Sequence, residues 1–236
     1  MKREADLSSV RTVCAEAVSI AGLPPARAFL FDMDGTIVNN CAWHVLAWQA
    51  FSEAYGNRLS ERQILDWMGA TNLEYQRRIL GREVGPEESV RLENEKEALY
   101  RKLYAPHMKL AEGLRPFLDE AHRRAVACAI VSGAPRQNID FICSGLNLFD
   151  DFPCIVDASQ YARSKPEPDC YLTAAERLGV SPADCIVFED AVGGIVSGRR
   201  AGMYTVALTG TNPRATLAQA EPDLIIDSFL ELSPAA

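Results

Sequence analysis

The sequence predicts an α/β fold: a parallel sheet with helices on both faces, and an all-helical domain inserted after the first strand. Short apolar runs alternate with helical patterns from residue 113 onward, as they do in βαβ units. One further apolar run lies far upstream, at 26–31, and its nearest candidate neighbours begin beyond residue 125. Residues 41–104 carry a helical pattern with no convincing strand, so we interpret this stretch as an insertion.

The composition is that of an ordinary globular chain. Hydrophobic residues make up 48% of the 236 residues and charged residues 24%, so the chain can bury a core. The length suits one large domain or a core with an inserted module. The seven cysteines are an odd number without a C-x-x-C pair, which favours free thiols over disulfides or zinc ligands.

Charge and hydropathy argue against several classes of partner. The 24 basic and 32 acidic residues give a net charge of −8, and no basic run could follow a nucleic acid or an anionic bilayer. The longest apolar stretch, 125–131, has seven residues, whereas roughly 20 span a membrane. The N-terminus has no apolar segment like that of a secretory signal. We expect a cytoplasmic protein with no nucleic-acid or membrane partner; its oligomeric state stays open.

The elements are assigned in chain order. Residues 8–21 place small apolar side chains on one helical stripe, which Gly-Leu-Pro-Pro ends, so residues 1–25 are predicted to be a helical extension. The apolar run at 26–31 leads into a cluster of Asp and Gly, as a buried parallel strand entering a functional loop does. Residues 40–111 are predicted to be the helical domain. Its expected breaks lie near Gly56, near Gly69 and at 81–86.

The remaining elements complete a Rossmann-like core formed by residues 26–39 and 112–236. Helices are predicted at 113–124, 135–146, 167–178 and 192–201, and strands at 126–131, 153–156, 185–188, 205–208 and 224–226. Because strands and helices alternate, the strands are expected to run parallel.

Polar residues follow three of the predicted strands. The strand at 26–31 runs into Asp32-Met33-Asp34-Gly35-Thr36, the strand at 126–131 into Ser132-Gly133, and the strand at 185–188 into Glu189-Asp190, while a loop carries Ser164-Lys165-Pro166. Taken singly, these are ordinary turn, cap or solvated residues. Because ligands bind beyond the carboxyl ends of the strands in such sheets, we expect all four segments to meet at one edge.

The two aspartates of the DMDGT segment suit a nucleophile and a proton donor. Two carboxylates one residue apart can divide these roles if their surroundings push their pKa values apart; Asp32 would attack and Asp34 would move the proton. Like charges about 4 Å apart cost roughly 4 kcal/mol per pair at an effective dielectric near 20, which Lys165 alone cannot offset. A hard divalent cation is therefore expected, and Mg²⁺ suits a site of few carboxylates and substrate oxygens.

If the group that Asp32 attacks is a phosphoryl group, its charged oxygens need a cation and hydrogen-bond donors around them. The Ser132 hydroxyl, the Gly133 amide and the Lys165 ammonium group supply them. Gly35 would let the backbone turn closely past the phosphate.

The ordered set DMDGT, Ser132, Lys165 and Glu189-Asp190 resembles the haloacid dehalogenase superfamily, most of whose members are phosphohydrolases, from about residue 28 to the end. The resemblance implies that Mg²⁺ is held by Asp32, the backbone carbonyl of Asp34, Glu189 and Asp190. It also implies that the first aspartate is phosphorylated and that water then releases the phosphate, with Asp34 acting as acid and later as base. We expect an enzyme that hydrolyses a small sugar phosphate or a similar metabolite.

The insertion resembles the helical cap of the β-phosphoglucomutase-like branch, with hinges near Asn39 and Glu112. His44 lies twelve residues after Asp32, where sugar-phosphate phosphatases and mutases of this branch also have a histidine. The resemblance implies that His44 positions Asp34 when the cap closes. Alternatively, His44 is simply a polar residue on a cap helix.

A phosphomutase is the alternative activity. The mutase pattern in the cap has an arginine that binds a second phosphate, whereas this chain reads Gly69-Ala70-Thr71-Asn72, with asparagine at that position. Three other arginines could compensate, namely Arg77, Arg78 and Arg136, the last of which follows Ser132 at an edge that a substrate anion could reach. The departure at Asn72 favours the phosphatase.

A catalytically silent binding or scaffold protein is the alternative from another class, because a fold alone does not give a function. Such a protein would tolerate the loss of the acids and the lysine, and all of them are present. Four aromatic residues of the helical segment, Trp43, Trp48, Trp67 and Tyr75, could form a recognition surface. Aromatic residues at helical spacing more often pack in a core, which is the interpretation we prefer.

Overall fold

The computed structural model describes residues 16–20, 22–67 and 70–232. The chain divides into two compact units. The sheet unit comprises Met1–Asn39 and Lys109–Ala236, and the helical unit comprises Asn40–Met108.

Within the described residues, the sheet unit contains one parallel six-stranded sheet with the strand order β3-β2-β1-β4-β5-β6. The strands are β1 (Ala28–Phe31), β2 (Ala127–Val131), β3 (Cys154–Val156), β4 (Cys185–Glu189), β5 (Tyr204–Leu208) and β6 (Leu224–Ile226). The central strand β1 pairs with β2 on one side and with β4 on the other. The predicted parallel sheet is confirmed, and the carboxyl ends of these three strands are neighbours.

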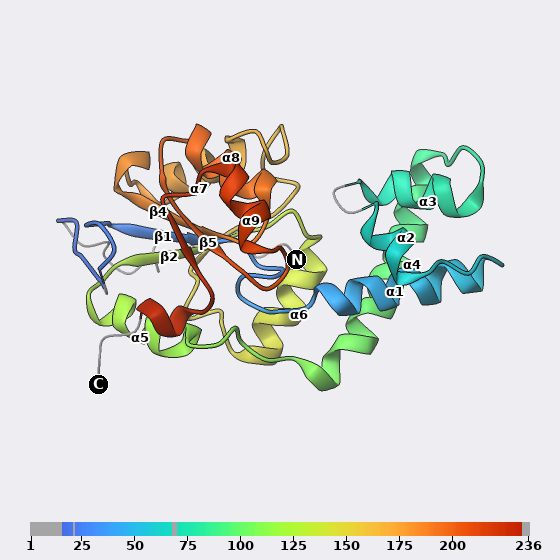
Figure 1. Ribbon diagram of the computed structural model, residues 1–236, viewed down its shortest axis with the longest axis horizontal. Helices are drawn as coiled ribbons and strands as arrows, with labels where there is room; N and C mark the ends of the chain where they lie inside the picture. Colours follow the sequence, from blue (N-terminus) through green and yellow to red (C-terminus); the bar gives the residue numbers. More distant parts are fainter. Residues whose placement is uncertain (1–15, 21, 68–69, 233–236) are drawn as a thin grey trace, which may run out of the picture. The chain divides into compact units, whose positions relative to one another are not determined.

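Helices cover both faces of this sheet, as predicted, with α7 and α8 on one face and α5 on the other (Figure 1). The helices of the sheet unit are α5 (Leu114–Arg123), α6 (Arg136–Leu146), α7 (Asp169–Leu178), α8 (Val192–Arg200) and α9 (Arg214–Leu217), with single turns η3 (Pro182–Asp184), η4 (Ala218–Ala220) and η5 (Phe229–Leu232).

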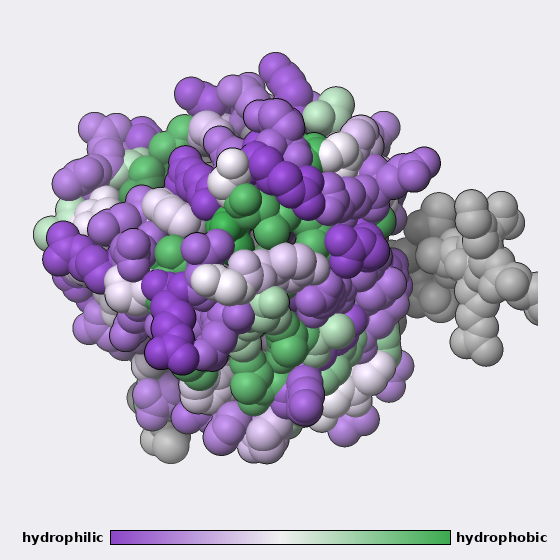
Figure 2. Space-filling model, turned by 90° about the vertical axis from the view of Figure 1, so that its right-hand side faces the viewer, coloured by the Kyte–Doolittle hydropathy of each residue, from purple (hydrophilic) through white to green (hydrophobic). Residues whose placement is uncertain are grey.

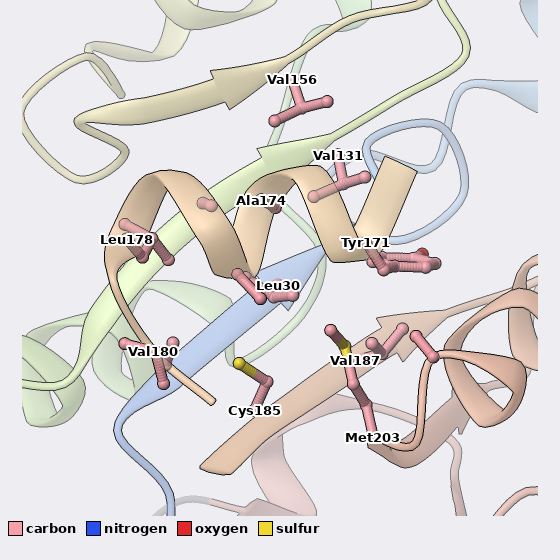
Figure 3. Packing of buried hydrophobic residues seen from close by; sticks show 14 of the residues in the cluster. Leu30, Val131, Val156, Tyr171, Ala174, Leu178, Val180, Cys185, Val187 and Met203 are labelled. Atoms are coloured by element: carbon pink, nitrogen blue, oxygen red, sulfur yellow. The ribbon is translucent and has the colours of Figure 1, made fainter. Parts of the chain in front are cut away.

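The side chains of α7 pack on one face of the sheet because alternate strand residues point toward it. Leu30, Val131 and Val187 come from the three central strands and belong to one buried cluster with Ala174 and Leu178 of α7. Figure 3 shows this cluster, with α7 lying across the strands.

On the opposite face of the sheet, the two phenylalanines of β1 pack against other aromatic rings. Phe31 stacks on Phe188 of the neighbouring strand with the ring centroids 4.7 Å apart. Phe29 stacks on Phe117 of α5 at 5.3 Å. Large rings on one face and smaller aliphatic side chains on the other hold β1 rigidly at the centre of the sheet.

The helical unit contains α1 (Cys41–Ala54), α2 (Glu61–Leu65), α3 (Asn72–Leu80), α4 (Pro86–Tyr104) and the turn η2 (Ala105–His107). The helical pattern predicted for 41–104 is confirmed. Ser60 and Thr71 start α2 and α3 through capping boxes, which satisfy amide groups at the first turn. Trp48 stacks on Tyr75 with the centroids 4.5 Å apart, and both side chains are buried in the core of this unit, so they pack rather than form an exposed surface.

The predicted N-terminal helix is wrong over its described part. Residues 16–20 are not helical. Instead, Val18 and Ala26 exchange two backbone hydrogen bonds of 3.0 Å as an antiparallel bridge, because the turn of Gly-Leu-Pro-Pro folds the chain back on itself. Residues 1–15 and 21, which carry most of the predicted stripe, lie outside the described residues.

None of the described helices combines the length with the apolar character needed to cross a bilayer. On the face shown in Figure 2, hydrophilic side chains surround the smaller apolar areas.

Gly113 illustrates a close approach that the fold depends on. It has a φ of +78°, and a Cβ there would overlap the backbone nitrogen of Leu230 in η5. We expect Gly113→Ala to lower the free energy of unfolding by about 2 kcal/mol or more, because left-handed backbone costs about 1–2 kcal/mol and the clash adds to it. Urea unfolding measures the loss. Gly202→Ala is the control, with a φ of +77° and nothing within 4 Å of its Cβ; equal losses in the two variants would contradict the proposed clash.

Candidate active site

Three neighbouring strands deliver acidic and polar residues to one edge of the sheet. Asp32 directly follows β1, Ser132 directly follows β2, and Glu189 is the last residue of β4. Because the three strands are adjacent and parallel, these side chains come together although more than 150 residues separate the first from the last.

Lys165 joins two of the acids. Its Nζ donates to Asp32 Oδ1 at 2.6 Å and to Glu189 Oε1 at 2.7 Å. A third hydrogen bond, of 3.2 Å, runs to the backbone carbonyl of Val131 at the end of β2. The ammonium group is therefore fixed between the ends of the three central strands.

Glu189 is held at both of its carboxylate oxygens. Oε1 accepts from Lys165 and also from the hydroxyl of Tyr171 at 2.8 Å. Oε2 accepts from the backbone amides of Asp190 at 3.1 Å and Ala191 at 3.3 Å. A Cβ at Gly194 would overlap this carboxylate, so the absence of a side chain at Gly194 makes room for it.

Asp190 lies against the turn that follows β1. A Cβ at Gly35 would overlap the Asp190 carboxylate and would lie 2.5 Å from Thr211 Oγ1. Gly35 also has a φ of +86°, which favours glycine. Asn212 donates to the backbone carbonyl of Asp190 at 3.0 Å. The turn and the loop after β5 thus enclose this acid from two sides.

Burial perturbs the ionisation of the group. It raises the pKa of Asp32 well above its ordinary value, against the opposing charge of Lys165. Burial and the neighbouring Glu189 raise the pKa of Asp190 to about 7. Burial alone would lower the pKa of Lys165, but Asp32 and Glu189 raise it well above the usual range. The lysine keeps its charge, whereas burial disfavours the charged forms of Asp32 and Asp190.

The three acids fit a divalent cation. Asp32, Glu189 and Asp190 are all buried, and each offers a carboxylate oxygen within 4.8 Å of those of the other two. Carboxylate oxygens are the donors that hard cations prefer. A bound cation would favour the charged forms of Asp32 and Asp190, which burial and the neighbouring carboxylates disfavour.

Ser132 and Gly133 line the same edge after β2. Ser132 is buried, and its Oγ accepts from the amide of Ala134 at 3.1 Å. The hydroxyl of Tyr161 lies 3.7 Å from the point that a Cβ on Gly133 would occupy. Arg136 is exposed and donates to Asp140, one turn along α6, at 2.7 Å.

Asp34 lies in the turn between β1 and the helical unit. It is half-buried, and its charge raises the pKa values of both Asp32 and Asp190. The structure thus brings the second aspartate of DMDGT close enough to interact with the acid cluster.

The helical unit contains the remaining predicted residues. His44 stacks on Tyr100 with the ring centroids 3.8 Å apart, and its Nδ1 lies 2.9 Å from Nζ of the buried Lys96. Lys96 also donates to Glu97 at 2.9 Å. Asn72 donates to Glu93 at 2.9 Å. Gly69 lies outside the described residues.

Sequence reasoning missed several residues of the site. Thr211 and Asn212 follow the end of β5, so the rule that located the other strand-end residues could have identified them. Tyr171 and Gly194 lie within helices, where the sequence pattern alone gives no signal of a polar partner.

Comparisons with known proteins agree with this geometry. A scan against protein families matches residues 26–202 to the haloacid dehalogenase-like hydrolases. The chain is 31% identical to a β-phosphoglucomutase of Bacillus subtilis over 79% of this chain and 85% of that protein. It is 28% identical to hexitol phosphatase A of Escherichia coli, over 88% and 93% of the two chains. The crystal structure of a HAD hydrolase, family IA, variant 3, from Entamoeba histolytica superposes with a TM-score of 0.82 at 29% identity, covering 86% of this chain and 94% of that one.

Proposed function

The chain belongs to the haloacid dehalogenase-like hydrolases, and from this membership and the geometry of its site we propose that it is a Mg²⁺-dependent phosphomonoester hydrolase acting on a small sugar phosphate or a similar metabolite. One observation carries the proposal: Lys165 bridges Asp32 and Glu189 beside Asp190. Phosphoryl transfer requires a nucleophile, a fixed positive charge such as the Lys165 ammonium group, and oxygen ligands for a metal ion.

Asp32 and Asp34 divide the chemistry. A carboxylate oxygen of Asp32 bonds to phosphorus as the bond from phosphorus to the ester oxygen breaks, and Asp34 gives its proton to the leaving oxygen. Asp34 then takes a proton from a water molecule that attacks the phosphorus of the aspartyl phosphate. The bond to Asp32 breaks, inorganic phosphate leaves, and both carboxyl groups return to their starting state.

The other residues bind the phosphoryl group. Lys165, the Ser132 hydroxyl and the Gly133 amide hold its oxygens. Gly35 gives the backbone room at the turn.

Asp32, Glu189, Asp190 and the backbone carbonyl of Asp34 would hold the Mg²⁺ ion. When bound, the ion neutralises the charge of the acids and of the phosphate oxygens.

We propose that the helical unit acts as the cap and that His44 positions Asp34 when the cap closes. Within the helical unit, Nδ1 of His44 pairs with Nζ of Lys96 at 2.9 Å. Lys96 is buried between His44 and Glu97, so its ammonium group is fixed. Such a pair can hold an imidazole in one orientation.

Contacts within the helical unit favour the hydrolase over the phosphomutase. Asn72, at the position of the mutase arginine, binds the carboxylate of Glu93, so this point offers no positive charge for a second phosphate. Arg77 pairs with Glu83 at 2.8 Å, and Arg78 lies over the ring of Trp67 at 5.2 Å. In the sheet unit, Arg136 is likewise paired, with Asp140.

The experiment that tests the activity is an assay with Mg²⁺ and a panel of phosphomonoesters that includes β-glucose 1-phosphate, following free phosphate and glucose 6-phosphate. Free phosphate without glucose 6-phosphate is expected. Glucose 6-phosphate with little free phosphate would establish the mutase instead. The absence of both products across the panel would favour the silent scaffold.

Mg²⁺ is expected to stabilise the folded protein, because the ion binds the clustered carboxylates only when they are held together. At a concentration of 100 times the dissociation constant, the gain is about 2.7 kcal/mol, seen as a rise in Tm. Asp190→Asn, which removes one charged ligand, should reduce the rise. An unchanged Tm in the wild-type protein would contradict the metal site.

A further inference from the structure

We propose that Tyr171 is a positioning residue of the active site: its hydroxyl orients the Glu189 carboxylate, and through it the metal ligands and Lys165. The inference deepens the proposed function and rests on it.

The contacts of Tyr171 join it to both partners. Its hydroxyl donates to Glu189 Oε1 at 2.8 Å, the same oxygen that accepts from Lys165. The Lys165 Nζ also lies 5.1 Å from the centroid of the Tyr171 ring, within the range of a cation–π interaction. The Tyr171 side chain therefore contacts both the Glu189 carboxylate and the Lys165 ammonium group.

Packing gives Tyr171 the rigidity that this role needs. The residue is 0% exposed and lies in the cluster between α7 and the strands. Figure 3 shows its ring extending from α7 near Val131 and Val187, residues of the strands on either side of β1. A ring fixed in this way holds its hydroxyl in one place.

The hydroxyl completes the set of donors around Glu189. With Lys165 and two backbone amides, it makes four donors for one carboxylate, two on each oxygen. Without it, Oε1 would accept from Lys165 alone, so three donors instead of four would hold the carboxylate and Oε1 could rotate further about the two amides on Oε2. Rotation would change both the direction of its lone pairs and the position of the lysine between Glu189 and Asp32. Groups that hydrogen-bond to a ligating carboxylate typically change metal affinity or activity 10–100-fold when they are removed.

The test is Tyr171→Phe, which removes the hydroxyl and keeps the ring. We expect the dissociation constant for Mg²⁺, measured by isothermal titration calorimetry on the full chain, to rise about 10-fold, with a similar fall in kcat. Tyr204→Phe is the matched control. Tyr204 is the first residue of β5 and therefore lies at the amino ends of the strands, whereas the site lies at their carboxyl ends. This variant should leave both values unchanged.

A second measurement separates positioning from a general loss of stability. In a Glu189→Gln background, Tyr171→Phe should produce little further loss of Mg²⁺ affinity, because the carboxylate that it orients is already gone. The inference would be overturned if the two substitutions reduced Mg²⁺ affinity by independent factors in the double variant. It would also be overturned if Tyr171→Phe had the same Mg²⁺ affinity and kcat as Tyr204→Phe. Neither result would count against the hydrolase activity of the wild-type protein. A wild-type protein that neither binds Mg²⁺ nor hydrolyses the panel would overturn the proposed function, and the inference with it.

Discussion

Asp32→Asn is expected to reduce turnover by about 10⁴-fold or more, the scale seen when a catalytic nucleophile or its partners are removed. The amide keeps the shape of the side chain and an oxygen that can accept from Lys165, which donates to this residue at 2.6 Å. It cannot form an aspartyl phosphate. Substrate and Mg²⁺ are still expected to bind, so KM and metal titrations should change far less than kcat.

The stability of this variant gives a second result. Burial disfavours the charged form of Asp32, so replacing it with a neutral amide should leave the metal-free protein at least as stable as the wild type. Thermal unfolding without Mg²⁺ measures this. Asp150→Asn, at an exposed position outside the site, is the control for turnover. Appreciable turnover by Asp32→Asn would count against a covalent step at this residue.

Gly194→Ala is expected to lower kcat by about 10²-fold or more, the scale of a displacement of about 1 Å at a catalytic group. The new methyl group would occupy the place of the Glu189 carboxylate. That carboxylate cannot simply move aside, since Lys165 and Tyr171 bind one oxygen and two backbone amides bind the other. Moving it would release Lys165 and displace one of the proposed metal ligands.

The adjacent glycine supplies a matched control. Gly193→Ala is in the same helix, and its Cβ would have nothing within 4 Å, so activity should be retained. Because alanine favours a helix over glycine, this control should also be slightly more stable. Steady-state kinetics and Mg²⁺ titration of the two variants provide the comparison; a Gly194→Ala enzyme with the kcat of Gly193→Ala would show that the position of Glu189 does not matter.

Most of the sheet could be predicted because its strands are short apolar runs that end in polar segments. The run at 26–31 had no neighbour in sequence, and its pairing with β2 and β4 follows from the alternation further along the chain. The predicted helix at 8–21 fails over its described part because helical periodicity in a short stretch of small apolar residues also fits an extended segment. Val18 uses its backbone groups to pair with Ala26, which a count of apolar positions does not register.

The sequence predicted the site residues that directly follow strands. It did not predict those that lie within helices. Asp32, Lys165 and Glu189 are joined directly, as the shared edge of the sheet indicated. Tyr171 lies on the buried stripe of α7, where an aromatic residue predicts packing and its hydroxyl carries no signal. Nothing in the sequence distinguishes Gly194 from other glycines. Its role becomes visible only from the position of the Glu189 carboxylate.

The most direct test of the account is to detect the phosphoryl group on Asp32. The Asp34→Asn variant would be mixed with para-nitrophenyl phosphate, whose leaving group needs no proton, quenched in acid and analysed by mass spectrometry. Because this variant lacks the proposed base for the attacking water, the phosphorylated enzyme should accumulate, with one phosphoryl group on the peptide that contains Asp32. Steady release of nitrophenolate by this variant while Asp32 remains unmodified, or a phosphoryl group on a different residue, would contradict the account.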